Sequence, residues 1–302
     1  MPWQPLPYDA WRASRDTLHG HTQVLGKVAL ALAPPEPELQ HGALRLTARG
    51  WETAPLTARD GSGTIGLTLD LRIHEVVAEH SDGRGSSVPL MPNRSVADVT
   101  SDVLAAVRAL AGDVVINMKP QETPWSTPLD EDTEHATYDA VHVAAYFDAA
   151  TRAASVLTEL RAPYRGRSTQ VNAWWGGFDL AVSLFSGAPA APPADDFIMR
   201  NSMDAQEIAV GWWPGDVRYP HAAFYAYVHP PEDDLRNVEL PAGGWDSGLG
   251  EFVLDWDDVV AAADPHETAL DFCRTFARNA CRLCGWDPEL AGTVDSVPPP
   301  VR

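Results

Sequence analysis

The apolar pattern of this chain changes period from segment to segment, and the resulting order of elements is what most constrains the fold. Residues 14–32 repeat apolar side chains at helical spacing, and three prolines between 34 and 37 end that segment. Residues 43–90 then alternate apolar and polar side chains, with turn sequences between the runs, which is typical of strands. Ser95 predicts the start of a second helix, which Gly112 ends.

The second half repeats this order. A short buried strand over 114–118 and a third helix from about 138 to 161 lead into it. Four strand-like stretches then precede a last helix from about 265 to 284. These stretches cover 168–187, 205–213, 222–230 and 250–256. Strands grouped between helices predict an α+β fold, with antiparallel sheets of meander type packed with about four helices.

Two domain organisations are compatible with this order. Residues 119–135, "KPQETPWSTPLDEDTEH", are acidic and proline-rich and predict a linker or surface loop, with Trp125 as an anchor. They would join two similar halves, 1–118 and 136–290, although no residue-level repeat is visible. The alternative is one continuous unit over 1–302, ending in a disordered tail from 293 to 302.

Composition excludes several classes of partner. The chain has 42 acidic and 22 basic residues, a formal net charge of −20, which repels nucleic acid and anionic membranes. No apolar run reaches the roughly 18 residues of a membrane span, and no signal peptide is recognisable. We therefore expect a cytoplasmic protein.

Two weak motifs have simple structural interpretations. "GSGTIG", residues 61–66, matches a dinucleotide fingerprint but is followed by a strand, so it predicts a hairpin turn. Cys273, Cys281 and Cys284 share a helical stripe with apolar residues and predict core packing rather than a zinc site. We expect no metal and no nucleotide or other cofactor.

The stretch "TLHGHTQVLGK", residues 17–27, carries the first candidate site residues. His19, Gln23 and Lys27 recur at four-residue spacing and share one helical stripe, which is either a solvated face or a working surface. Gly26 beside the stripe indicates close approach of another group, because glycine destabilises a helix interior by up to about 1 kcal/mol. His21 falls with the apolar residues and is expected in the core or an interface.

A second candidate lies in "NAWWGGFDLAVSLFSG", residues 172–187. Asp179 interrupts an apolar run, and a buried aspartate needs a cation or several hydrogen-bond donors. Trp174 and Trp175 should point to opposite faces of a strand, and Trp212 and Trp213 repeat the pair. Eleven tryptophans indicate either a heavily aromatic core or a tryptophan-walled pocket for a small molecule.

Across these segments the chain resembles a bacterial family known as domain of unknown function 5996. The matching pieces run nearly from end to end and include "WQPLPYDAW", "TLHGHTQVLGK", "PNRSVADV", "NAWWGGFDLAVSLFSG", "GWWPG" and "GEFVLDWDDV". The resemblance implies one continuous unit and no general reaction. Two family patterns are changed here: an N-H-W-W region reads "ELQHGA", and Gln206 stands where a histidine is expected. If those histidines serve catalysis elsewhere, this chain has lost or altered that activity.

The retained residues imply a shared pocket. The expected catalytic residues are His19, Lys27, Asp179 and Glu207, and the expected substrate-binding residues are Gln23, Arg49, Trp174, Trp175 and Trp213. This set suits proton abstraction combined with stabilisation of an anionic leaving group, as in a lyase or cyclase of bacterial specialised metabolism. An elimination or a ring-closing, aziridine-forming displacement is one such reaction. The alternatives are a small-molecule-binding protein without catalysis, or a subunit whose tryptophans contact a protein partner or a second copy.

Overall fold

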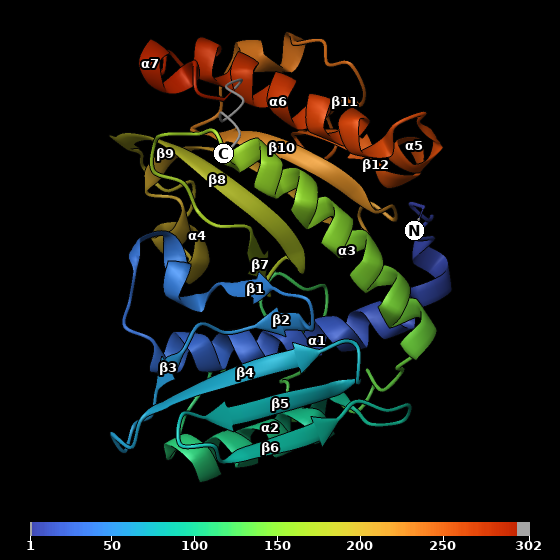
Figure 1. Cartoon of the computed structure of the whole chain (residues 1–302), viewed down its shortest axis with the longest axis vertical. Coiled ribbons are helices and arrows are strands. Elements are labelled where there is room, and N and C mark those ends of the chain that lie inside the picture. Colours follow the sequence, from blue (N-terminus) through green and yellow to red (C-terminus); the bar gives the residue numbers. More distant parts are fainter. Residues whose placement is uncertain (1, 295–302) are drawn as a thin grey trace, which may run out of the picture.

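The computed structural model describes residues 2–294, and within them four long helices account for most of the helical structure (Figure 1). The long helices are α1 (Tyr8–Leu32), α2 (Val96–Ala111), α3 (Ala140–Arg161) and α6 (Pro265–Leu283). The short ones are α4 (Phe197–Ser202), α5 (Trp256–Ala261), α7 (Pro288–Ala291) and the 3₁₀ turns η1 (Pro37–Gly42) and η2 (Asp233–Asn237). The predicted class, α+β with antiparallel strands and about four helices, is confirmed.

Twelve strands form one antiparallel sheet rather than the separate sheets expected. The first half supplies β1 (Leu44–Leu46), β2 (Gly50–Glu52), β3 (Leu56–Thr57), β4 (Thr64–Asp70), β5 (Glu75–His80) and β6 (Gly85–Pro89). The second supplies β7 (Asn172–Trp174), β8 (Asp179–Pro189), β9 (Ala205–Trp213), β10 (Ala223–His229), β11 (Gly244–Asp246) and β12 (Glu251–Asp255). The spatial order is β11-β12-β10-β9-β8-β7-β1-β2-β4-β5-β6, with β3 beside β4.

The two sequence halves meet where β1 pairs with β7. Leu44 lies opposite Ala173 and Arg45 opposite Asn172, so strands of both halves hydrogen-bond into one sheet at its centre. A continuous sheet gives the halves a shared core, because the cluster of buried apolar residues runs through both. Whether the halves unfold together stays a prediction.

Strand alternation divides the second half of the sheet into a core face and an open face. The apolar even-numbered residues in the middle of β8, β9 and β10, such as Leu184, Val210 and Phe224, are buried. Helices α3 and α6 contact these strands, and Figure 1 shows α3 lying across β8. The odd-numbered residues point away from this core and include polar side chains.

Helix α1 has no solvated face over its central turns. Every residue from 17 to 29 is buried, because α1 contacts α2, α3, η1 and strands β3 and β4. His21 is buried, as predicted. The interpretation of residues 17–27 as the wet side of an amphipathic helix is therefore wrong.

Local signals placed most element boundaries correctly. Ser95 caps α2 in a reciprocal capping box with Asp98, and the turn between β3 and β4 confirms that "GSGTIG" is not a nucleotide loop. The strand predicted over 114–118 is wrong, since this segment has no strand partner and the Val115 side chain is 86% exposed. Valine favours an extended backbone, but a strand also needs a free sheet edge beside it.

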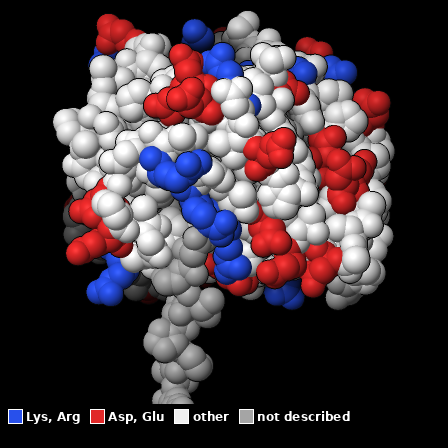
Figure 2. All heavy atoms as spheres, turned by 90° about the horizontal axis from the view of Figure 1, so that it is seen from above, with Lys and Arg blue, Asp and Glu red and all other residues white. Residues whose placement is uncertain are grey.

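The C-terminal end of the described chain packs against the hydrophobic core. The predicted tail begins at 293, but Val294 is fully buried, and residues 295–302 lie outside the described part of the chain. Among residues 2–294, no helix combines the length and the apolar character that crossing a membrane requires. Figure 2 shows acidic side chains spread over the face seen from above, with a short row of basic side chains across its middle.

Candidate functional site

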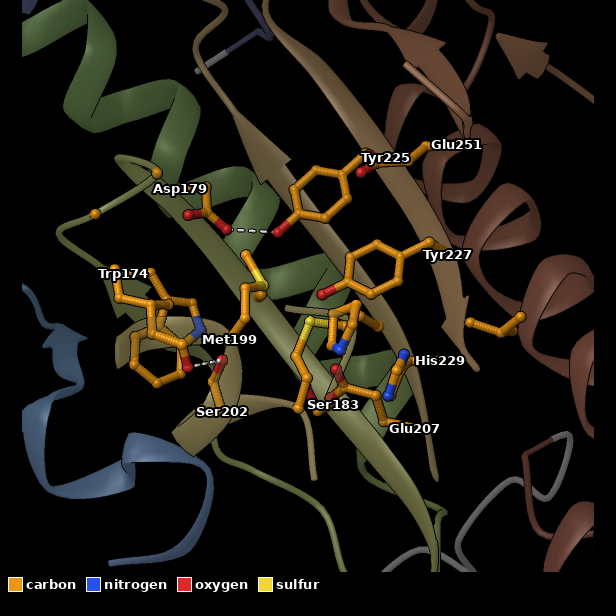
Figure 3. A pocket seen from close by; sticks show the side chains of 18 of the residues that line it. Trp174, Asp179, Ser183, Met199, Ser202, Glu207, Tyr225, Tyr227, His229 and Glu251 are labelled. Atoms are coloured by element: carbon orange, nitrogen blue, oxygen red, sulfur yellow. Dashed lines mark hydrogen bonds between the residues drawn. The ribbon is translucent and has the colours of Figure 1, made fainter. Parts of the chain in front are cut away.

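A cavity of about 570 Å³ lies on the open face of β8, β9, β10 and β12 (Figure 3). Its volume is within the range of small-molecule sites. Residues of η1, α4, η2 and β11 form further walls, together with Leu30 of α1, Glu122 and the turn after β7, so segments far apart in the sequence contribute to it. The cavity therefore depends on the complete second half of the sheet and on η1 from the first half.

The floor of the cavity follows from strand alternation. Asp179, Ala181 and Ser183 of β8 line it, as do Glu207 and Ala209 of β9 and Tyr225, Tyr227 and His229 of β10. Small residues open the space: a Cβ at Gly211, between Ala181 and Tyr225 in the sheet, would come 2.3 Å from the Tyr225 ring. The Tyr225 side chain consequently crosses β9 and reaches β8.

Asp179 is held by that tyrosine. The Tyr225 hydroxyl donates to Asp179 Oδ2 at 2.5 Å, and Figure 3 shows the two side chains pointing toward each other. Withdrawal from solvent raises the pKa of Asp179 to about 7, although this hydrogen bond opposes the shift. The sequence predicted that this aspartate would need a cation or donors, and the donor is a phenol.

Two further carboxyl groups of the strands face the same cavity, and Glu38, Glu122 and Glu232 line its other walls. Glu207 is only 5% exposed, and burial raises its pKa to about 7, while a hydrogen bond from Ser183 lowers it. Burial likewise raises the pKa of Glu251 on β12 to about 7. Asp179, Glu207 and Glu251, which we call the carboxyl triad, can therefore each accept or donate a proton near neutral pH.

Aromatic side chains form the walls beside the triad. Trp213 lies edge-on to Tyr225 with ring centroids 5.4 Å apart, and Trp174 and Trp245 also line the cavity. The neighbouring Trp212 is fully buried on the core face. The pair Trp212–Trp213 thus divides between core and pocket, as strand alternation predicts.

The stripe His19, Gln23 and Lys27 does not line this cavity. His19 Nε2 donates to Gly176 O at 2.8 Å, and Gln23 Nε2 donates to Trp175 O at 3.0 Å and to Gln121 O at 2.9 Å. Burial lowers the pKa of His19 to about 3, so its ring is neutral and weakly basic. These side chains hydrogen-bond the segment around Gln121 and the turn after β7 to α1, and their catalytic roles stay untested.

Lys27 and Gly26 hold Trp175 from the same helix. Lys27 Nζ donates to Lys119 O at 2.7 Å and lies 5.2 Å from the Trp175 ring centroid, and burial lowers its pKa to about 8. A Cβ on Gly26 would come 1.9 Å from Trp175 Cδ1, so the close approach predicted for this glycine is that of a tryptophan ring. Trp175 Nε1 donates to Gly42 O at 3.0 Å, and the ring reaches the cavity wall.

Arg49 lies away from the cavity. Its Nε donates to Asp70 at 2.8 Å, in the first half of the sheet. Of the nine residues predicted for one shared pocket, the structure therefore brings together five: Trp174, Trp175, Asp179, Glu207 and Trp213. His19, Gln23, Lys27 and Arg49 do not line the cavity. The first three contact Trp175 from the buried helix α1, where their polar groups serve as packing and hydrogen-bond partners.

Several lining residues were missed at the sequence level. Tyr225, Tyr227 and His229 occupy every second position of "AFYAYVH", a period-two pattern that places three polar groups on one face. Glu251 begins its strand, and Glu38 lies in η1, where no local pattern marks it. Glu38 is ion-paired to Arg167 at 2.5 Å.

The cysteines are packing residues. Cys273 and Cys281 are fully buried and Cys284 is half-buried, which confirms the predicted core role. Within residues 2–294, no group of three or more His, Cys, Asp or Glu side chains is arranged to hold a metal ion.

Comparison with protein families gives one match. A family model described as a family of unknown function (DUF5996) matches residues 3–292. The chain belongs to this family. Comparison of this DUF5996 chain with curated proteins and with solved structures gave no match.

The two positions at which the sequence leads us to expect a departure from the DUF5996 pattern have different environments. Gln206 accepts a hydrogen bond from Ser186 at 3.0 Å and lies outside the cavity lining. The "ELQHGA" region contributes Glu38, Leu39, Gln40 and Gly42 to the wall. Of the two departures, only the second changes the surface that a ligand would contact.

Proposed function

We propose that this protein is an enzyme that transforms a small polar molecule by acid/base chemistry in the 570 Å³ cavity. One observation carries the proposal: Asp179, Glu207 and Glu251 project from three strands into one cavity, next to two phenols. General acid/base groups are most effective when their pKa lies near the working pH, which the raised values of the triad support.

The triad suits an elimination or a ring-closing displacement. One carboxylate removes a proton from a C–H or N–H group, and the released electron pair forms the new double bond or ring bond. The leaving group departs with its own bonding pair and takes a proton from a second, protonated carboxyl group or from a phenol. Tyr225 and Tyr227 remain protonated, because burial and the neighbouring carboxyl groups raise the pKa of each phenol well above its ordinary value.

The biological setting follows the sequence-based expectations. The proposal places a lyase- or cyclase-type activity in the cytoplasm of a bacterium, in specialised metabolism and without a nucleotide cofactor. The alternatives are a protein that binds the same ligand without transforming it, and a partner subunit. The expected loss of family histidines favours the binding protein, whereas the three carboxyl groups of the triad favour catalysis.

A generic proton-abstraction substrate tests the proposal without knowledge of the natural one. 5-Nitrobenzisoxazole loses its ring C–H proton, its N–O bond breaks, and a coloured nitrophenolate forms. We expect the protein to convert 5-nitrobenzisoxazole about 10²-fold faster than acetate does at equal concentration. This factor is the lower end of the range for a positioned general base. The rate should rise with pH around a midpoint of about 7, where the triad ionises.

Matched variants assign that rate to the cavity. The triple variant Asp179→Asn, Glu207→Gln and Glu251→Gln should reduce it to the level of acetate, and each single variant shows which carboxylate is the base. Asp271→Asn and Glu79→Gln remove exposed carboxylates outside the cavity and should change nothing. A wild-type rate no higher than that of the folded triple variant would reject catalysis and favour the binding protein.

A further inference from the structure

We infer that the natural ligand of the cavity is a cation, namely a small protonated amine with an apolar body. This rests on the proposed function in one respect, that the cavity is a small-molecule site. It goes further by assigning the charge and the chemical class of the ligand. The cavity wall contains arginines that are already ion-paired with acids and carboxyl groups that are not ion-paired with a base.

The positive groups of the wall are already paired. Arg218 is ion-paired with Asp216 at 2.7 Å, and Arg236 is ion-paired with Asp233. Neither Asp216 nor Asp233 lines the cavity, so these guanidinium groups are directed to acids outside it. They form no ion pair with the triad, although the charge of Arg218 partly opposes the raised pKa of Glu251 over a longer distance.

The carboxyl triad has no such partner. Among residues 2–294, no Lys, Arg or His side chain forms an ion pair with Asp179, Glu207 or Glu251. The hydrogen-bond donors that they do have, Tyr225 and Ser183, are neutral hydroxyl groups. A buried carboxylate without a cation is costly, so a positively charged ligand would stabilise the ionised triad.

The walls are suited to the rest of such a ligand. The rings of Trp174, Trp213 and Trp245 line the cavity, and the faces of aromatic rings attract cations. Arg236 already lies 5.8 Å from the Trp245 ring centroid, which shows that this wall accepts a positive group. Apolar parts of a ligand would pack against the same rings and against Met199 of α4 and Met203, which follows that helix.

The charge of the whole molecule acts in the same direction. With a formal net charge of −20, and acidic side chains spread over the face shown in Figure 2, the protein attracts cations and repels anions over long range. An organic amine fits better than a bare metal ion, because the described acidic side chains form no metal-binding group and the walls are aromatic.

Three probes of one shape test the assigned charge. Phenethylamine is a cation, phenethyl alcohol is neutral and 3-phenylpropionate is an anion, and all carry the same ring. Titration calorimetry at about pH 8, where the triad is ionised, should show the amine binding at least about tenfold more tightly than the alcohol, and no binding of the anion. Lowering the pH through 7 to about 5 should weaken binding of the amine about tenfold and leave the alcohol unchanged.

Single variants of the carboxyl triad test which carboxylates cause the preference for the amine. Asp179→Asn, Glu207→Gln and Glu251→Gln should each weaken amine binding at least about fivefold without weakening the alcohol. The exposed controls Asp271→Asn and Glu79→Gln change the net charge equally and should have no effect. Equal or tighter binding of the alcohol or the anion, or an amine preference that survives in all three variants, would overturn the inference, as would failure of all three probes to bind.

The two proposals can fail separately. 5-Nitrobenzisoxazole is neutral, so its conversion without any preference for the amine would reject the cationic ligand and leave the acid/base function standing. Preference for the amine without conversion of 5-nitrobenzisoxazole would reject catalysis and leave the ligand class standing. The surface control variants serve both experiments.

Discussion

Replacing Gly26 by alanine should destabilise the protein by about 3 kcal/mol, the upper end of the usual cost of overpacking a core. The added Cβ would lie 1.9 Å from Trp175 Cδ1, and the indole cannot retreat without breaking its hydrogen bond to Gly42 O. Helix propensity alone predicts the reverse, because alanine stabilises a helix interior by about 1 kcal/mol relative to glycine. The sign of the effect therefore distinguishes the tertiary contact from the local preference.

Urea unfolding followed by tryptophan fluorescence measures this difference. Gly66→Ala is the matched control, since a Cβ there meets no atom within 4 Å, and it should leave the midpoint unchanged or slightly raised. If Gly26→Ala were as stable as the wild-type protein, Trp175 would not be seated against α1. The position of the cavity wall next to Trp175 would then be incorrect as well.

Replacing Glu207 by glutamine should stabilise the protein at alkaline pH and leave its stability unchanged at acidic pH. The folded state raises the pKa of Glu207 from 4.5 to about 7, so the folded protein holds this proton more tightly than the unfolded chain. The resulting stabilisation is present below pH 4.5 and is lost as the pH rises through about 7. At about pH 8.5 the wild-type protein should therefore be less stable than the variant by roughly 3 kcal/mol, at about 1.4 kcal/mol per pKa unit.

The test compares free energies of unfolding at several pH values. The substituted amide has the shape of the carboxyl group, and its carbonyl oxygen can accept the hydrogen bond from Ser183, so packing changes little. Glu79→Gln, which removes an exposed carboxylate on β5 outside the cavity, is the matched surface control. A Glu207→Gln variant whose stability matches the wild-type protein at both ends of the pH range would show that Glu207 ionises normally.

Much of the fold could be predicted from the sequence because its signals are local. The residues of β9 match the predicted strand 205–213, and Ser95 caps α2 as predicted. The joining of both halves into one sheet could not be predicted. It rests on the pairing of two three-residue strands, β1 and β7, that lie far apart in the chain. Such short strands carry little pattern of their own.

The residues of the candidate site also differ in whether the local sequence could predict their role. Asp179 was identified because a polar residue interrupts an apolar run, and Trp213 because it belongs to a pair of adjacent tryptophans. Both line the cavity. The stripe on α1 has the same kind of signal, but the segment around Gln121 covers it and uses its polar groups as hydrogen-bond partners. Spacing along one helix indicates which side chains share a face, and only tertiary contacts decide whether that face meets a ligand or another part of the chain.

Asp179, Glu207 and Glu251 line one cavity, and burial raises the pKa of each carboxyl group to about 7. The most direct measurement is a pH titration of the carboxyl ¹³C chemical shifts of the free protein, with Asp179, Glu207 and Glu251 assigned by the single variants. We expect apparent pKa values of about 7 for these groups. Values of about 4 for all three, as for exposed carboxylates, would contradict this expectation.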